Sequence, residues 1–434
     1  MIMAMIRPET EMKDSGIEWI GDIPANWGKS KLKYLGVYIN GYAFKPSDWS
    51  ARGRQIIRIQ DLTGSNSGEP NYFDGTLDEK YRVVNGDILV SWAATLDAFV
   101  WTKEDGWLNQ HIFKAVPNEK IVKGYFLWLL KVAMDNMNND DKHAIVMQHV
   151  TIGLFNNYVV PLAPYTEQQA IADYLDETCS KIDEIIAEAK ASIAEYKELK
   201  QSVIFKAVTK GLNKNVAMKD SGYDFIGCIP SEWEMCKVRH LGTAQNGISI
   251  GGDAFGSGHP FVSYGDVYKN YSLPKTVDKL VQSSEEDRKR YSVEKGYWFF
   301  TRTSETIEEV GFSCVCEETI PDAVFAGFLI RVRPFNNRIY TGFAKYYFRS
   351  NHLRTFFVKE MNLVTRASLA QGLLKDAPVV VPPYDEQIEI ANYLENKCEI
   401  IDGVIKDKES TINDLEAYKK SLIYEVVTGK RRVV

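Results

Sequence analysis

The sequence repeats itself after more than 200 residues. Residues 12–16 (MKDSG) return as residues 218–222 at an offset of 206, and residues 164–168 (PYTEQ) return as residues 383–387 (PYDEQ) at an offset of 219. Further pairs at the second offset are residues 171–175 with 390–394, Cys179 with Cys398, and residues 208–209 with 427–428. The period is far too long for a solenoid, so it predicts two copies of one domain plan.

Between the shared blocks the sequences of the two halves diverge, and only a few short segments remain similar. Residues 86–92 (GDILVSW) resemble residues 296–302 (GYWFFTR), and residues 40–41 (NG) return as residues 246–247. Each half therefore consists of a variable body followed by a shared tail. Within the bodies, short apolar runs bounded by Gly, Asp or Pro predict strands, and longer apolar runs predict helices. The expected strands are 56–59, 88–92 and 379–381, and the expected helices are 124–130 and 344–348.

The shared tails have the spacing of long helices with one apolar stripe. In the first tail the stripe is Ile171, Leu175, Ile182, Ile185, Ala189, Ile193, Tyr196, Leu199, Val203 and Ala207. In the second it is Ile390, Leu394, Ile401, Ile405, Ile412, Leu415, Tyr418, Leu422 and Val426, with Lys408 at the position of Ala189. Steps of three and four are typical of a coiled coil. A helix over residues 171–207 would be about 55 Å long. We expect each helix to pair with its copy; the alternative is that each packs only on its own domain.

Composition sets the broad class of protein. A hydrophobic content of 45% is that of a globular chain, and no stretch reaches the ~20 apolar residues of a membrane helix. Neither a secretory signal nor a disulfide framework is recognisable, which favours the cytoplasm. The net charge of −6 is unusual for a nucleic-acid-binding chain, so positive charge must be local or supplied by partners.

No catalytic or metal motif is complete. The glycines around Gly28-Lys29-Ser30 lack the spacing of a phosphate-binding loop. Val381-Pro382-Pro383-Tyr384 resembles the substrate loop of adenine methyltransferases, but Val381 replaces its polar first residue. Cys314 and Cys316 lack a second ligand pair, and the six histidines show no metal-binding spacing.

The repeated blocks MKDSG…IG…IP…W and PYxEQxxIAxYL resemble those of the specificity subunit of type I restriction–modification enzymes, over nearly the whole chain. The resemblance implies an α+β fold in which two α/β target-recognition domains are separated by two long helices. These helices would form an antiparallel coiled coil within a pseudo-twofold repeat. It implies boundaries at 1–160 and 216–379 for the recognition domains and at 161–215 and 380–434 for the helical spacers.

The same resemblance implies function and partners. Each domain would read half of a bipartite, asymmetric site on double-stranded DNA. Two methylation subunits would dock on the helices, and two restriction subunits could join them. This chain would hold no cofactor and would not be an enzyme, because S-adenosylmethionine, ATP and magnesium would serve the partner subunits. A rigid spacer would fix the number of unread base pairs between the half-sites.

Residues that contact DNA are predicted from local composition. The segment 39–58 joins basic and aromatic side chains, which suit phosphate and base contacts. Trp92 and Arg302 follow matching strands, and Arg302 could bind guanine or pair with Glu305 or Glu308. The full set of candidates is Tyr42, Lys45, Arg52, Arg54, Arg58, Trp92, Gln110, Gln148, Tyr264, Lys269, Arg302, Ser304 and Arg366.

Two other classes of protein stay open at this point. The chain could be a scaffold that binds a methylation subunit without DNA, which a gel shift with the assembled complex would reveal. It could also be a self-sufficient methyltransferase, which methyl-donor binding by the isolated chain would reveal. The incomplete loops argue against the second class.

Overall fold

The computed structural model describes residues 5–65, 68–139, 150–304, 310–360 and 367–433. The chain forms two compact units, Met1–Ala189 with Ser410–Val434, and Lys190–Glu409. It passes between them inside two long helices, α4 (Tyr165–Lys210) and α10 (Tyr384–Val427). Each unit therefore holds one α/β body and half of each long helix, and each is described by itself.

The first unit has two four-stranded sheets. One is built, in spatial order, from β10 (Asp97–Val100), β9 (Ile88–Ser91), β12 (Ile112–Pro117) and β5 (Gly36–Asn40). The other is built from β7 (Tyr72–Phe73), β6 (Arg54–Ile57), β11 (Gly106–Leu108) and β8 (Arg82–Val83). Its helices are α1 (Ile59–Thr63), α2 (Lys123–Asn139) and α3 (Ile152–Asn157). Shorter pairings join β2 (Met12–Asp14) to β3 (Asp22–Pro24), β4 (Gly28–Lys31) to β13 (Val159–Leu162), and β1 (Met5–Ile6) to β27 (Arg431–Arg432).

The second unit repeats this plan. Its main sheet has the order β17 (Gly242–Asn246), β24 (Leu329–Pro334), β20 (Trp298–Thr301) and β22 (Ser313–Val315). The next sheet has β19 (Leu280–Val281), β18 (Phe255–Val262) and β23 (Val324–Phe325). The two-stranded sheets pair β14 (Met218–Asp220) with β15 (Cys228–Pro230), β16 (Glu234–Lys237) with β26 (Pro378–Val381), and β21 (Thr303–Ser304) with β25 (Ala367–Ser368). The helices are α5 (Tyr264–Lys269), α6 (Glu285–Arg290), α7 (Thr341–Tyr347), α8 (Asn351–Glu360) and α9 (Gln371–Asp376).

Strand pairing confirms the duplication. The second sheet of each unit contains one parallel pair, β6 with β11 in the first unit and β18 with β23 in the second. The predicted runs 88–92, 379–381, 124–130 and 344–348 are present as β9, β26, α2 and α7. The predicted strand 56–59 is wrong in its second half, because β6 ends at Ile57 and Ile59 begins α1, where Asp61 accepts a hydrogen bond from the N–H of Arg58 at 2.8 Å. The mixed α/β bodies are therefore confirmed.

The repeated PYxEQ block attaches each long helix to its body. Glu167 accepts a hydrogen bond from the indole Nε1 of Trp27 at 3.1 Å, and Glu386 accepts one from Trp233 at 2.8 Å. Both indoles are almost completely buried, so each would lose a partner if the carboxylate were removed. This contact explains why the tryptophan and the glutamate recur together in the two halves.

The glutamine of the block makes a second attachment. The side-chain oxygen of Gln168 accepts from the backbone N–H of Val122 at 2.9 Å, just before α2. Gln387 accepts likewise from Tyr340 at 2.7 Å, just before α7. Each amide also donates to the backbone just before its own helix, so buried donors and acceptors are satisfied on both sides.

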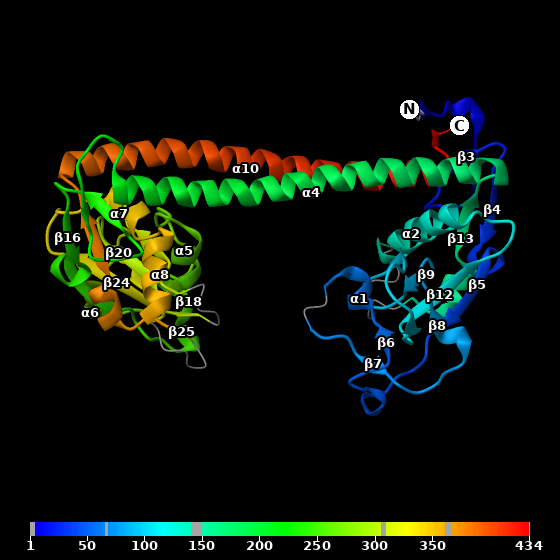
Figure 1. Ribbon diagram of the computed structural model, residues 1–434, viewed down its shortest axis with the longest axis horizontal. Coiled ribbons are helices and arrows are strands. Elements are labelled where there is room, and N and C mark those ends of the chain that lie inside the picture. Colours follow the sequence, from blue (N-terminus) through cyan, green and yellow to red (C-terminus); the bar gives the residue numbers. More distant parts are fainter. Residues whose placement is uncertain (1–4, 66–67, 140–149, 305–309, 361–366, 434) are drawn as a thin grey trace. The chain divides into compact units, whose positions relative to one another are not determined.

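The long helices lie antiparallel within each unit (Figure 1). In the second unit, Lys200 contacts Asp402 at 2.6 Å and Lys408 lies 5.9 Å from the ring centre of Tyr196. In the first unit, Lys419 contacts Asp183 at 2.6 Å. Residue numbers rise along one helix while those of their partners fall along the other. The expected pairing of the two copies is confirmed.

The predicted stripe is wrong at three positions. Ile185, Leu199 and Tyr418 are about half exposed, whereas Ile186, Cys179 and Cys398 are buried. The buried face instead follows steps of three and four through Lys200 and Lys419. The side chains of these lysines are mostly covered, and each ammonium group contacts an aspartate on the facing helix. A lysine can fill an apolar position because its methylene stem packs while its charge stays paired. A purely apolar pattern could not anticipate this.

His352 is buried where α8 meets α4. Its imidazole lies 5.6 Å from the ring of Phe205 and contacts Ser350 through Nδ1. Burial lowers the pKa of His352 to about 3, and the nearby charge of Lys210 acts in the same direction. The folded second unit therefore holds a neutral imidazole.

This depressed pKa predicts a loss of stability in mild acid. Below pH ~6.5 the unfolded chain binds a proton that the folded chain does not, so stability present above that pH falls as the pH drops. Between pH 7.5 and 5.0 the loss from this group is about 2 kcal/mol. Urea unfolding of His352→Gln should show a correspondingly smaller decline than the wild type, with the exposed His240→Gln as control. An equal decline in wild type and His352→Gln would contradict this account.

Candidate nucleic-acid interface

In both units, the residue that follows an inner strand of the main sheet occupies the same backbone position. After β9, the N–H of Trp92 donates to His111 at 3.4 Å, and after β20 the N–H of Arg302 donates to Phe328 at 2.9 Å. The carbonyl groups of Trp92 and Arg302 accept from Val150 at 3.1 Å and from Leu369 at 2.7 Å. Trp92 and Arg302 are therefore equivalent residues, placed by the same two backbone contacts in each body. Both side chains are half-buried just past the ends of these inner strands.

A close backbone crossing brings two further candidates together in the first body. Tyr42 donates its N–H to Leu108 at 2.8 Å, and Gln110 donates to the carbonyl of Tyr42 at 2.9 Å. The crossing needs Gly41, because a Cβ there would collide with the backbone of Asn109. Gly247 makes the same close approach to Ala326 in the second body. The glycine of the repeated Asn-Gly pair is thus a requirement of the crossing.

An aromatic cluster extends from this crossing. Tyr42 packs edge-on against Phe44 at 5.0 Å and Tyr81 at 5.8 Å, and Phe44 packs against Phe73 at 5.5 Å. Tyr42 and Phe44 belong to the segment singled out from the sequence. Phe73 and Tyr81 were not anticipated, because they reach the cluster only through the folding of β7 and the turn before β8. Aromatic faces and edges of this kind suit contact with nucleobases.

The predicted basic residues have different surroundings. Lys45 and Arg52 are exposed, and Arg54 is half-buried with its guanidinium 4.9 Å from the ring centre of Trp107. Arg58 precedes α1 and its Nε is buried without a hydrogen-bond partner among the described residues. Arg52 and Arg54 line a cavity of about 510 Å³. Lys45 and Arg52 are thus exposed cations, whereas Arg54 is held against an indole.

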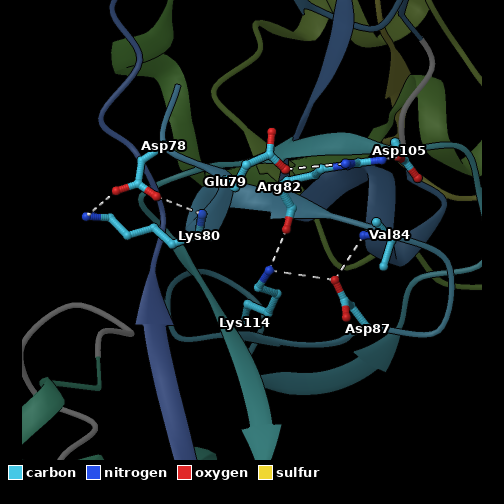
Figure 2. A network of polar contacts seen from close by, with 8 residues as sticks. All are labelled: Asp78, Glu79, Lys80, Arg82, Val84, Asp87, Asp105 and Lys114. Atoms are coloured by element: carbon cyan, nitrogen blue, oxygen red, sulfur yellow. Dashed lines mark hydrogen bonds and ion pairs between the residues drawn. The ribbon is translucent and has the colours of Figure 1, made fainter. Parts of the chain in front are cut away.

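Neighbouring cations are already neutralised (Figure 2). Arg82 contacts Asp105 at 2.5 Å and Glu79 at 3.3 Å, and these contacts raise the pKa of its guanidinium. Lys80 contacts Asp78 at 3.3 Å. These paired charges help to reconcile the negative net charge with local basic side chains, because only cations without a carboxylate partner are fully available to phosphate.

A cation with little exposed surface holds the same segment in both bodies: Lys114 is half-buried and Arg331 is buried. In β12, Lys114 donates to the carbonyl of Arg82 at 2.5 Å (Figure 2). In β24, Arg331 donates to Ser292 at 2.7 Å and to Arg290 at 3.2 Å. Burial lowers the pKa of Arg331 to about 10. Both cations fix the turn that precedes the central strand, so they act on the scaffold of the interface.

The second body places its candidates on and near α5. Tyr264 stacks on Tyr268 at 5.8 Å, and Lys269 is exposed. Arg349, not predicted from the sequence, donates to the carbonyl groups of Val267 at 3.1 Å and Asn270 at 3.2 Å. This guanidinium therefore holds the C-terminal end of α5 against the body.

Three sequence candidates cannot be placed in full. Gln148 and Arg366 lie outside the described residues, as do Glu305 and Glu308, the alternative partners of Arg302. Ser304 is described only through its backbone in β21. Their roles stay predictions.

The described residues give no support to the incomplete catalytic motifs. Gly28–Lys31 forms the strand β4, and Val381 is buried in β26. Burial raises the pKa of Cys316 to about 12 and also raises that of Cys314, which favours the protonated thiol at both positions near neutral pH. No cluster of His, Cys, Asp or Glu that could hold a metal ion occurs in the part of the chain that the structure describes. Within that part, no helix is long and apolar enough to cross a membrane.

Two α/β bodies of one topology, each attached to antiparallel long helices, define a duplicated two-domain protein. The "Type I restriction modification DNA specificity domain" family matches residues 24–195 and 230–413. These matches cover most of the chain, which therefore belongs to the family of type I restriction–modification specificity subunits.

Similar proteins agree with this assignment. The EcoBI specificity subunit of Escherichia coli is 23% identical over 97% of this chain and 89% of its own length. The putative MjaX specificity subunit of Methanocaldococcus jannaschii is 23% identical over 95% and 96%. A solved chain described for complex assembly of a type I R-M system has a TM-score of 0.71 at 14% identity, covering 94% of this chain and 99% of that one. At that identity the structural likeness concerns the fold alone.

The position of Arg302 predicts a specific effect on recognition. A guanidinium that forks onto guanine contributes about 1–3 kcal/mol of discrimination. Arg302→Ala should therefore relax one letter of one half-site and leave the other half-site unchanged. Sequencing of the methylated sites made by the assembled enzyme measures this, with Trp92→Ala as the matched variant of the other body. An unchanged motif would dismiss the role of Arg302.

Proposed function

We propose that the two bodies read the two unlike halves of a bipartite DNA site. One observation carries this proposal: equivalent backbone positions bear different side chains. Trp92 corresponds to Arg302. The parallel bridges Tyr42–Asn109 and Ile248–Ala326 are equivalent, so the residues that follow them, Gln110 and Gly327, are counterparts. One backbone plan with unlike side chains at the same edge would recognise different bases, because bases are distinguished by the donors, acceptors and apolar groups that face them.

The long helices would act as a spacer between the readers. The chain crosses between the two units inside both helices, after Ala189 and after Glu409. Continuous helices resist bending, so their length would set the number of base pairs left unread. In this proposal the segments 1–160 and 216–379 are the readers, and 161–215 and 380–434 are the spacers.

Exposed apolar side chains on the helices support docking of partner subunits. Tyr165 and its equivalent Tyr384 are 60% and 45% exposed, and Leu199 and its equivalent Tyr418 are 48% and 49% exposed. Because the same positions recur in both halves, they suit two copies of one partner. We assign these surfaces to two methylation subunits, with restriction subunits as further partners in the cytoplasm.

The chemistry would then belong to the partners. Adenine methylation with S-adenosylmethionine, and ATP- and magnesium-dependent cleavage, would be carried out by the methylation and restriction subunits. This chain would choose the site without catalysing a reaction. A gel shift of the assembled complex with DNA separates this function from that of a scaffold, which would bind the methylation subunit and show no sequence preference.

A matched insertion tests the spacer. One heptad inserted after Ala189 and another after Glu409 would lengthen both helices by about 10 Å, or roughly three base pairs. We expect the unread gap to grow by about that amount while both half-sites keep their letters, as measured by mapping methylated adenines.

The control is the same insertion in α4 alone. It leaves α10 too short to follow the longer helix, so we expect assembly or activity to fall without a new defined gap. An unchanged gap in the doubly extended chain would contradict the spacer, as would a change in the half-site letters.

A further inference from the structure

The first body contains a cavity that the general DNA-reading role does not yet explain. It measures about 510 Å³ and lies among Arg52, Arg54, Phe73, Asp74, Glu79 and Trp107. Basic, acidic and aromatic side chains thus share one concave site. Their arrangement narrows what the site can bind.

Strand pairing places Arg54 on a strand with an aromatic residue on each neighbouring strand, Phe73 on β7 and Trp107 on β11. Arg54 lies opposite Phe73 in the antiparallel pair of β6 and β7. Ile56, two residues along β6 and so on the same face as Arg54, lies opposite Trp107 in the parallel pair with β11. The guanidinium of Arg54 therefore rests over the indole, 4.9 Å from its ring centre. Trp107 is only 3% exposed, which makes it a fixed support.

Because Trp107 holds its guanidinium in place, Arg54 is suited to donating hydrogen bonds to a ligand. A guanidinium stacked on an indole keeps its N–H donors in a plane directed away from the ring, and less side-chain freedom is lost when it binds. Among the described residues, no carboxylate pairs with Arg54 or with Arg52. Their donors are available to a ligand. The buried indole of Trp107 leaves no free face on which an unstacked base could lie.

The acidic side chains argue against a phosphate at the same place. Asp74 and Glu79 both line the cavity, and within the part of the chain that the structure describes only Glu79 of the two has a cationic partner, Arg82. A carboxylate near a phosphate is repulsive, whereas the edge of a neutral base tolerates it. Guanine offers two acceptors, O6 and N7, at the spacing of the guanidinium fork.

We propose that Arg54 reads a guanine of the half-site bound by the first body, with Trp107 holding its fork in position. The assignment rests on the proposed function and adds the base and the residue. Arg52, which is exposed to solvent and has no aromatic support, contacts backbone phosphate outside the cavity instead.

At the position of Arg54 the second body has the same backbone conformation but a different side chain. Gly53 and Gly258 both have positive φ, 119° and 106°, and a Cβ on either would collide with the backbone of the facing strand. The next residue is Arg54 in one body and His259 in the other. His259 contacts Ser283 at 3.3 Å and Arg288 at 3.5 Å. A guanine contact from this backbone position is therefore particular to the first body, and the second half-site serves as an internal control.

The test uses this chain assembled with its methylation subunits and a library of duplexes randomised in both half-sites. Arg54→Ala should reduce the preference for guanine at one position of one half-site by roughly 5- to 150-fold. Arg54→Lys should lose most of the same preference, because an ammonium keeps the charge without the fork. Retained letters in the second half-site show that the variant is folded.

Arg52→Ala is the matched control. It should weaken methylation of all duplexes alike, reduce the salt dependence of binding, and leave every letter unchanged. The same uniform loss in Arg54→Ala would make Arg54 a phosphate contact and overturn the assignment, as would an unaltered guanine preference or a first half-site without guanine. A wild-type complex with no letter preference would overturn the proposed function, and this assignment with it.

Discussion

The charged contacts between α4 and α10 are the constraint on which the architecture depends. Lys200 with Asp402 and Lys419 with Asp183 are the same pair of positions repeated at an offset of 219 residues, each at 2.6 Å. Exposed ion pairs contribute little to stability, but these lysines occupy the mostly covered face of each helix. A charge at such a position penalises any other alignment of the helices, because a shifted register would leave it unpaired. The pairs therefore select one alignment of the two helices.

Each body is attached to these aligned helices through the repeated block at the start of its long helix. The glutamate and glutamine at the start of each long helix bind a buried tryptophan and the backbone before α2 or α7. Rigid attachment matters because a reader that rotated on its helix would not hold its side chains against particular bases. The bodies can then differ freely at the sheet edge. Trp92 and Arg302, or Arg54 and His259, change the surface without changing the frame.

Much of this frame could be predicted from the sequence. The repeated blocks identified the duplication and the long helices, since periodic patterns reflect packing that is local in the chain. The errors at Ile185, Leu199 and Tyr418 arose because two adjacent apolar residues, or an apolar residue beside a lysine, fit the helical period almost equally well. Only the facing aspartate decides in favour of Lys200 and Lys419. The interface was harder to predict from the sequence, because its side chains come together through sheet pairing between distant segments. Phe73, Tyr81 and Trp107 reach Tyr42, Phe44 and Arg54 in this way. Arg349 gave no sequence signal, and the DNA contacts of all these residues stay predictions.

The central claim is that one repeated frame carries two independent readers. Replacing residues 234–382 by a second copy of residues 28–163 tests it most directly, because the chain would then carry the same reader twice. Mapping the adenines methylated by the assembled enzyme should reveal a symmetric bipartite site made of the first half-site and its reverse complement. If the chain assembles with its partners and methylates the original asymmetric site, the bodies are not the readers and the account is contradicted.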